Sequence, residues 1–346
     1  MLFLATAVPG LHPVVVREVA ARMAGRVHSE HEFDGRNDVV SFNAAADPAV
    51  LSLRTTEDVF VQVSTATRRA GGLRTVVNGL CDDFGLTRAL SVYASLVRPL
   101  RARMTFRVVA RVRSETDFRR TALRDELTRR IGQLRPRWRM GDPAEIELWA
   151  TESTPGQFRL AVRLTSRSMR HRGGRVVERH GALRPTVAAA MVLLAGEPDA
   201  DAPLLDPCCG TRTILVEADM AAWRTAGSDF DAEAVRAARR NVDKSVDLLV
   251  ADVRRLPFGR GSVAAVTSNL PFGKQYDVQG PVGPWLTNAL RELVRVTRPG
   301  ARVVLLTPPT RAFHHALGEA PELKLEERFG LRLFGMPTTL WSLKRC

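Results

Sequence analysis

The strongest constraint on the fold is a regular alternation of short apolar runs and helical stretches in the second half of the chain. The apolar runs have the length of strands, and most end at a polar residue: Leu204–Asp206, Gly227–Phe230, Asp247–Asp252, Ala264–Asn269 and Arg302–Thr307. Strands that alternate with helices favour a parallel sheet with helices on both faces. The strand-like tail, Leu323–Leu333 and Pro337–Lys344, predicts an antiparallel hairpin at one edge of that sheet.

The first half of the chain has a different pattern. Up to about residue 168, strand-like runs such as Thr105–Val112 and Phe158–Leu164 alternate with amphipathic helices. The helix expected over Phe118–Leu134 carries its leucines at helical spacing and arginines elsewhere. This pattern predicts an α+β layout with antiparallel sheets. The Arg- and Gly-rich segment Ser166–Arg184 that follows is typical of a linker or an exposed hairpin.

Positive charge is concentrated in one quarter of the chain. The whole chain carries a formal net charge of +14. Between Arg98 and Arg184 there are 22 arginines, no lysine and nine acidic residues, so almost all of the excess lies there. A codon bias explains arginine in place of lysine, but it does not explain the clustering. The clustering favours a polyanionic partner, and nucleic acid is the one we expect.

Cysteines and hydropathy indicate where the protein works. The four cysteines include the adjacent Cys208 and Cys209, no C-x-x-C occurs, and we expect a reducing compartment. The pairs His28/His31 and His314–His315 lack a supporting cluster of ligands, so we expect no metal. The apolar stretch Val187–Ala195 is too short to cross a bilayer, and the N-terminus lacks the features of a signal peptide. We therefore predict a cytoplasmic protein with no membrane partner.

Three polar elements follow successive predicted strands. The first, Asp206-Pro207-Cys208-Cys209-Gly210-Thr211-Arg212-Thr213, combines a strand end, a glycine turn and a helix start. It is not G-x-G-x-x-G, so it favours an amino-acid-like group over a pyrophosphate. Asp229 lies 23 residues later and suits the hydroxyls of a ribose, and Phe230 beside it suits an adenine face. Asp252, a further 23 residues on, can accept from an adenine amino group.

The fourth element, Thr267-Ser268-Asn269-Leu270-Pro271-Phe272-Gly273, has a specific chemical interpretation. An exocyclic base amine is a poor nucleophile because its lone pair is delocalised into the ring. The Asn269 side-chain carbonyl and the Leu270 backbone carbonyl can both accept its hydrogens and so free the lone pair. Phe272 offers a stacking face worth about 1–3 kcal/mol to a flipped base. Most of the rate would then come from positioning.

Together the four elements resemble motifs I to IV of class I S-adenosylmethionine-dependent amino-methyltransferases. The Asn269-Leu270-Pro271-Phe272-Gly273 form is most similar to the THUMP-domain RNA guanine-N2 methyltransferases. The opening Phe3-Leu4-Ala5-Thr6 resembles the start of that subgroup's ferredoxin-like piece, and residues 170–186 resemble its connector into the first catalytic helix.

The resemblance implies a three-part protein. Residues 1–65 would form a ferredoxin-like domain, residues 66–168 a THUMP-like RNA-binding domain, and residues 169–346 a Rossmann-like methyltransferase domain with a linker at 169–185. Such a protein holds structured RNA, typically tRNA, and methylates the N2 of a guanine. The sequence leaves open whether an accessory subunit takes part.

The resemblance also implies a role for individual residues. The cofactor S-adenosylmethionine would be held by Thr186, Asp206, Pro207, Cys208, Gly210, Thr211, Asp229, Phe230, Asp252 and Asn269. The target base would lie against the catalytic residues Asn269, Leu270, Pro271 and Phe272. The basic region supplies the candidate RNA contacts, for which a solvated surface is the alternative: Arg119, Arg120, Arg124, Arg137, Trp138, Arg170 and Arg172.

Three departures from the family pattern keep other functions open. Asn269 stands where close members of the subgroup often have aspartate, a choice that bears on which amine is accepted. Leu270 replaces a proline and adds an N–H to the site. Arg212 stands where glycine is usual, and it can crowd the cofactor, contact its carboxylate or point to solvent. Crowding would favour a non-catalytic RNA-binding protein with a degenerate cofactor site. The motif also suits adenine-N6 or cytosine-N4 methylation of nucleic acid.

Overall fold

The structure is a computed structural model, and it describes residues 1–23, 26–69, 72–166, 183–240, 246–271, 281–333 and 335–346. The chain divides into two compact units, Met1–Arg170 and His171–Cys346. This division falls where we expect a linker, although residues 167–182 lie outside the described part. A further division of the first unit near residue 65 stays a prediction, because strand β4 (Asp58–Thr67) runs through that point.

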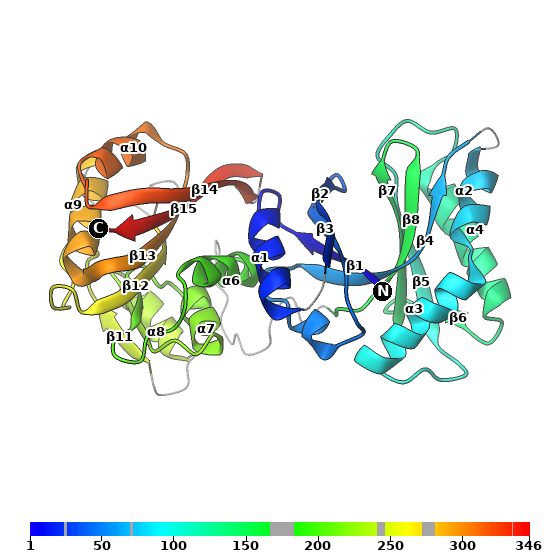
Figure 1. Ribbon diagram of the computed structural model, residues 1–346, viewed down its shortest axis with the longest axis horizontal. Helices are drawn as coiled ribbons and strands as arrows, with labels where there is room; N and C mark the ends of the chain where they lie inside the picture. The colour runs from blue at the N-terminus through cyan, green and yellow to red at the C-terminus, as the bar shows by residue number, and fades with distance from the viewer. Residues whose placement is uncertain (24–25, 70–71, 167–182, 241–245, 272–280, 334) are drawn as a thin grey trace. The chain divides into compact units, whose positions relative to one another are not determined.

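One mixed eight-stranded sheet forms the centre of the first unit (Figure 1). Its strand order is β2-β3-β1-β4-β8-β7-β5-β6. Most neighbours are antiparallel, and β5 pairs in parallel with β6 and β7. Besides β4, the strands are β1 (Leu2–Ala7), β2 (Arg26–Phe33), β3 (Asp38–Asn43), β5 (Thr105–Arg111), β6 (Arg139–Met140), β7 (Ile146–Thr154) and β8 (Gln157–Arg163).

Helices cover this sheet because each presents an apolar face. Helix α1 (His12–Arg22) packs beside β2 and β3, and the short helix η1 (Pro48–Ser52) precedes β4. Helices α2 (Gly72–Leu80), α3 (Asp83–Leu96) and α4 (Arg120–Leu134) pack on the strands β4, β8 and β5 (Figure 1). The leucine spacing in α4 is confirmed as its buried face, with Leu123 and Leu127 fully buried.

A mixed seven-stranded sheet forms the second unit, in the order β11-β10-β9-β12-β13-β15-β14. The strands from β11 to β13 are parallel, and β15 and β14 are antiparallel. The Rossmann-like sheet with an antiparallel C-terminal hairpin is therefore confirmed. The strands are β9 (Leu204–Asp206), β10 (Thr225–Asp229), β11 (Asp247–Val250), β12 (Val263–Asn269), β13 (Thr297–Thr307), β14 (Leu323–Leu333) and β15 (Met336–Arg345).

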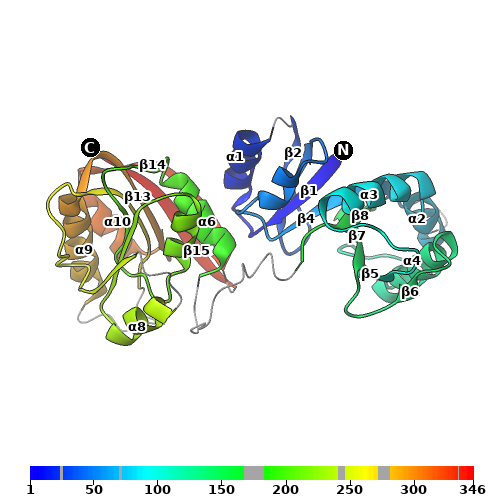
Figure 2. The same ribbon diagram turned by 90° about the horizontal axis from the view of Figure 1, so that it is seen from below.

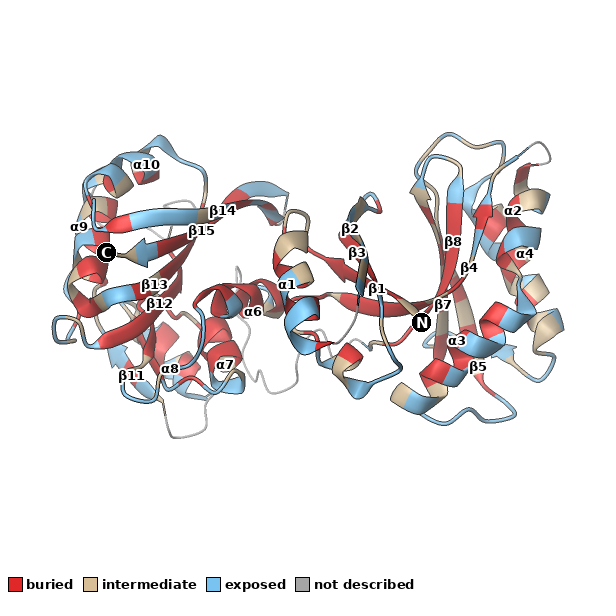
Figure 3. Cartoon of the chain, in the orientation of Figure 1, coloured by how far each residue is buried: buried red, intermediate tan, exposed pale blue. Residues whose placement is uncertain are grey.

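Helices lie on both faces of the second sheet. On one face, α9 (Val282–Val296) and α10 (Arg311–Gly318) bury Trp285 and Phe313 against β12, β13 and β15. Helices α6 (Pro185–Leu194), α7 (Thr213–Met220) and α8 (Ala232–Arg240) complete the unit, and Figure 2 shows α6 and α9 on opposite sides of the sheet. Figure 3 shows the buried strands between these layers. Among the described helices, none has both the length and the apolar character needed to cross a bilayer.

Candidate active site

Four site residues end neighbouring strands of the second sheet. Strand β9 lies at the point where the chain order reverses, with β10 and β11 on one side and β12 on the other. All four strands are parallel, so their carboxyl ends meet at one edge. This edge carries Asp252, Asp229, Asp206 and Asn269 in that spatial order, each at or just after its strand. A topological switch point of this kind is where open parallel sheets bind ligands.

The turn after β9 is joined to the end of β10. The Gly210 N–H donates a 2.9 Å hydrogen bond to Asp229 Oδ2, and the Asp231 N–H donates a 3.0 Å hydrogen bond to Asp229 Oδ1. Gly210 has a φ of +49°, and a Cβ added there would meet no atom within 4 Å. The backbone of this turn therefore lies open to a ligand, and the Asp229 carboxylate is fixed beside it.

Asp206 is the most buried acid of this edge, with 1% of its surface exposed. Its Oδ1 accepts a 2.8 Å hydrogen bond from the Ser268 hydroxyl and a 3.2 Å bond from the Cys208 N–H. Burial raises the pKa of Asp206 to about 7, and the negative charge of Asp229 also acts to raise it. A cationic group bound here would favour the ionised carboxylate.

The third acid is paired within its own turn. Both carboxylate oxygens of Asp252 accept from the Arg254 guanidinium, at 2.6 to 3.0 Å. This side-chain hydrogen bond lowers the pKa of Asp252, so the group stays ionised at neutral pH. Phe230, directly after Asp229, keeps 61% of its surface exposed. An exposed aromatic ring beside two ordered carboxylates suits the flat face of a base.

Asn269 is the last residue of β12, and its side-chain oxygen, Oδ1, is buried. Its Oδ1 has less than 1 Å² of exposed surface and accepts no hydrogen bond from the residues that the structure describes. A buried carbonyl without a donor costs free energy, which a bound N–H group would recover. The Leu270 N–H donates to the Leu306 carbonyl at 3.2 Å, so the N–H that leucine adds is satisfied by β13. Pro271 follows, and the expected stacking residue Phe272 lies outside the described residues.

Arg212 adopts a placement that the sequence did not suggest. Its side chain is 3% exposed, and its Nη2 donates a 2.7 Å hydrogen bond to Asp219 on α7. Of the three placements left open by the sequence, the solvent-facing one is therefore wrong, and the guanidinium forms an ion pair with the helix that follows it. Its φ of +80° explains why glycine is usual here, because the left-handed conformation suits a residue without a Cβ.

The remaining expected cofactor residues lie around the same turn. Thr186 is buried at the start of α6, Thr211 is buried just before α7, and the Pro207 carbonyl accepts from the Ser228 hydroxyl at 3.3 Å. Burial raises the pKa of Cys208 and Cys209 well above the usual range of a thiol. Both therefore stay protonated and are unsuited to nucleophilic attack.

Most candidate RNA contacts lie around α4 in the first unit. Arg119, Arg120, Arg124 and Arg137 are exposed or half-exposed, and Arg120 and Arg124 line a groove that α4 forms with β5 and β6. Trp138 has its ring centroid 5.9 Å from that of Phe106, as expected of a packing residue. Arg170 and Arg172 lie outside the described residues.

Three site residues were not predicted from the sequence. Ser268 stands within the fourth motif, and the alternation of β12 alone could have indicated that it faces away from Asn269. A Cβ on Gly227 would meet Leu215 Cδ1 at 2.5 Å, so this glycine permits close packing beside Asp206. Arg254 is a surface arginine by sequence, and only the turn after β11 reveals its contact with Asp252.

The second unit matches a known family. Residues 172–333 match the model of the RMKL-like methyltransferase domain. The matched residues fall within the second unit, so this unit is similar to the methyltransferase domain of that family. They include the switch-point edge and its four polar residues.

Curated relatives of the chain are larger proteins. It is 36% identical to the U6 snRNA (guanine-N(2))-methyltransferase THUMPD2 of Bos taurus, over 43% of this chain and 30% of that one. It is 28% identical to the tRNA (guanine(6)-N(2))-methyltransferase THUMP3 of Bos taurus, over 47% of this chain and 36% of that one. The matches thus span about a third of these relatives.

The fold of the whole chain has a solved counterpart. The crystal structure of TrmN from Thermus thermophilus matches with a TM-score of 0.79 over 100% of both chains, at 22% identity. The likeness in fold therefore extends beyond the methyltransferase domain to the basic first unit.

A methyltransferase domain of this kind implies S-adenosylmethionine as the methyl donor, and the residues fit it. The open turn at Gly210 leaves room for a ligand against the backbone. Asp206 suits its ammonium group, Asp229 its ribose hydroxyls, and the exposed Phe230 its adenine ring.

Proposed function

We propose that this protein is an S-adenosylmethionine-dependent RNA methyltransferase that forms N2-methylguanosine in tRNA. The observation that carries the proposal is the buried, unpartnered Asn269 Oδ1 at the switch-point edge of a methyltransferase domain, among the residues that the structure describes. It provides an acceptor for an exocyclic amine at the position where the fourth motif is expected to hold the target base.

The chemistry follows from the acceptors at the end of β12. The Asn269 side-chain carbonyl and the Leu270 main-chain carbonyl would accept the two hydrogens of the amine and localise its lone pair. S-adenosylmethionine, when bound, supplies an electrophilic methyl group. A nitrogen that is alkylated gains acidity and loses its proton readily, so the site needs no strong general base. Positioning of the amine then supplies most of the rate.

The substrate proposal rests on charge, fold and relatives. The basic first unit offers exposed arginines along α4, and polyanions bind such surfaces through counterion release. Two curated relatives carry names that specify guanine-N2 methylation of RNA, one of U6 snRNA and one of tRNA. We choose tRNA over the small nuclear RNA because a relative from Methanothermobacter thermautotrophicus, 33% identical over 27% of this chain and 28% of that one, also carries a name that specifies tRNA.

The test is transfer of labelled methyl groups from S-adenosylmethionine to transcribed tRNA that carries no modification, followed by nucleoside analysis. Label in N2-methylguanosine supports the proposal. Label in N6-methyladenosine or N4-methylcytidine would replace guanine as the target and leave the methyltransferase assignment intact. Absence of both methyl transfer and S-adenosylmethionine binding would support the non-catalytic RNA-binding alternative. The ion pair between Arg212 and Asp219 supports the catalytic proposal over that alternative, because it directs the guanidinium to α7.

A further inference from the structure

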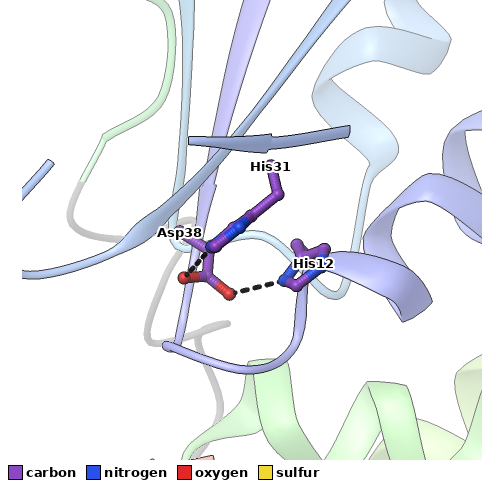
Figure 4. A group of neighbouring side chains, drawn as sticks. All are labelled: His12, His31 and Asp38. Carbon is purple, nitrogen blue, oxygen red and sulfur yellow. Dashed lines mark hydrogen bonds and ion pairs between the residues drawn. The ribbon is translucent and has the colours of Figure 1, made fainter. Parts of the chain in front are cut away.

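Three side chains converge in the first unit, far in sequence from the methyltransferase domain. His12 begins α1, His31 lies on β2 and Asp38 begins β3 (Figure 4). His12 Nδ1 lies 2.9 Å from Asp38 Oδ2, and His31 Nε2 lies 3.1 Å from Asp38 Oδ1. The two rings thus contact different oxygens of one carboxylate, and one ligand atom from each residue lies within 4.8 Å of the other two.

The carboxylate at the centre of this cluster is fixed. The Asp38 side chain is 3% exposed, and its Oδ2 also accepts a 2.7 Å hydrogen bond from the Gly10 N–H. The two imidazole rings stack at a centroid distance of 4.0 Å, which restricts their orientation relative to each other. The histidine side chains remain 27% and 48% exposed, which leaves solvent access for an ion. Backbone support of a ligating carboxylate is a common feature of metal sites.

Strand pairing, not sequence spacing, creates the cluster. Asp38 pairs with Ala7 on β1 and with Phe33 on β2. The chain leaves β1 at Ala7 and reaches His12 through the Gly10 turn, while His31 lies two residues before Phe33. The spacing 12, 31 and 38 matches no metal-binding motif, so the sequence alone does not predict that these three residues meet.

We propose that His12, His31 and Asp38 bind one divalent transition-metal ion, with Zn²⁺ the ion that the donor set suits. Two imidazole nitrogens and one carboxylate oxygen form a three-ligand site that water completes. The ion would replace the two direct contacts that now join the rings to Asp38. Each imidazole remains neutral by carrying its proton on the opposite nitrogen, Nε2 of His12 and Nδ1 of His31. The ion would fix the start of α1 to the β2–β3 hairpin at the sheet edge.

The experiment titrates Zn²⁺ into the full chain, freed of affinity tag and treated with a chelator, by calorimetry. Co²⁺ absorption in the visible range reports the coordination. We expect one equivalent to bind the unaltered protein, and at least about tenfold weaker binding in H12A, H31A and D38N. Asp38→Asn keeps the shape of the side chain, and circular dichroism checks that each variant folds.

Two matched controls use histidines outside the cluster. His28→Ala changes a histidine on the same strand, and H314A/H315A removes the adjacent pair on α10. Both should bind Zn²⁺ as the unaltered protein does. Zn²⁺ should also raise the melting temperature of the unaltered protein and of H28A, but not that of D38N. Absence of binding at about 100 µM Zn²⁺, or equal binding by the cluster variants and the controls, would overturn the proposal.

Discussion

The Ser268 hydroxyl donates a 2.8 Å hydrogen bond to Asp206 Oδ1 in the interior of the second unit. Ser268 precedes Asn269 on β12, and Asp206 ends β9, so the bond joins the proposed base site to the proposed cofactor site. Both residues are almost fully buried, and the carboxylate cannot replace this donor by water. The two sites are therefore positioned together by adjacent residues of one strand.

Replacement of Ser268 by alanine should weaken S-adenosylmethionine binding. The hydrogen bond favours the ionised form of Asp206, so its loss raises the pKa of this acid above about 7. We expect an affinity about tenfold lower at pH 7, corresponding to about 1.4 kcal/mol, and a smaller deficit at pH 9. Calorimetric titration of S-adenosylmethionine across this pH range measures the effect. Ser262→Ala, in an exposed turn before β12, is the control, and an equal loss there would contradict the assignment.

Asp206→Asn should weaken S-adenosylmethionine binding and make the free energy of unfolding less dependent on pH. The folded pKa of Asp206, about 7, lies above its ordinary value of 3.8, so folding takes up a proton between these limits. The stability that this group contributes is fully present below pH 3.8, falls by about 1.4 kcal/mol per pH unit and is lost above pH 7. The asparagine variant lacks this contribution to the dependence of unfolding free energy on pH.

Urea unfolding at pH 5.5 and pH 8 checks this expectation. The difference in unfolding free energy between variant and unaltered protein should move in favour of the variant as pH rises, because the remaining carboxylates titrate alike in both. Binding of S-adenosylmethionine should fall below detection in the variant. If the difference in unfolding free energy between the variant and the unaltered protein is the same at pH 8 as at pH 5.5, burial does not disfavour the ionised form of Asp206.

Periodicity and motif order predicted much of the second unit. The strands Leu204–Asp206 and Leu323–Leu333 and the helix Arg311–Gly318 occur within the expected bounds, and the antiparallel hairpin is present. These elements were predictable because apolar period and strand–helix alternation are local properties. The four polar strand ends were predictable as one site because parallel strands bring their carboxyl ends to one edge.

Other features depend on contacts that a linear pattern does not contain. Helices α2 and α3 were not predicted, and neither was β2, whose central residues, 28–32, are all polar and lack a strand-like apolar alternation. The pairing of Arg212 with Asp219 depends on a left-handed residue that turns the side chain along α7. The cluster of His12, His31 and Asp38 depends on the register of three strands.

Arg212→Gly and Arg212→Ala should differ in stability. The φ of +80° costs a residue with a Cβ about 1–2 kcal/mol, which glycine avoids and alanine does not. Both variants lack the ion pair to Asp219, but the Thr225 hydroxyl still donates to that carboxylate at 2.6 Å. We therefore expect the glycine variant to unfold at a higher urea concentration than the alanine variant.

The affinity for S-adenosylmethionine distinguishes an Arg212 that only stabilises the fold from one that contacts the cofactor. Since the guanidinium of Arg212 is turned to Asp219, both variants should bind S-adenosylmethionine within about threefold of the unaltered protein, a difference of less than about 1 kcal/mol. A loss of binding in Arg212→Gly with intact folding would mean that the arginine contacts the cofactor.

The arginines of α4 should contribute to RNA affinity by binding phosphates. Replacement of Arg119, Arg120 and Arg124 by alanine should weaken tRNA binding and flatten its dependence on salt. Each phosphate that is no longer neutralised reduces the slope of log K against log salt by about 0.7 to 0.9. Filter binding across a range of KCl concentrations measures the slope. The control removes the same charge from the second unit, at the exposed Arg311, Arg328 and Arg332, and an identical change in slope there would argue against a specific binding surface.

Asn269→Ala should abolish methyl transfer and leave S-adenosylmethionine binding within about threefold. In the proposed mechanism, the buried Oδ1 of Asn269 accepts an amine hydrogen that is present only when the base is bound, so its removal acts on turnover. Loss of one preorganised hydrogen-bonding group in an active site costs about a hundredfold or more in kcat. Asn269→Asp retains an acceptor oxygen and should recover part of the activity, whereas Asn288→Ala, on the exposed face of α9, should behave as the unaltered protein. Single-turnover methylation of unmodified tRNA measures the step, and full activity in the alanine variant would remove Asn269 from the reaction.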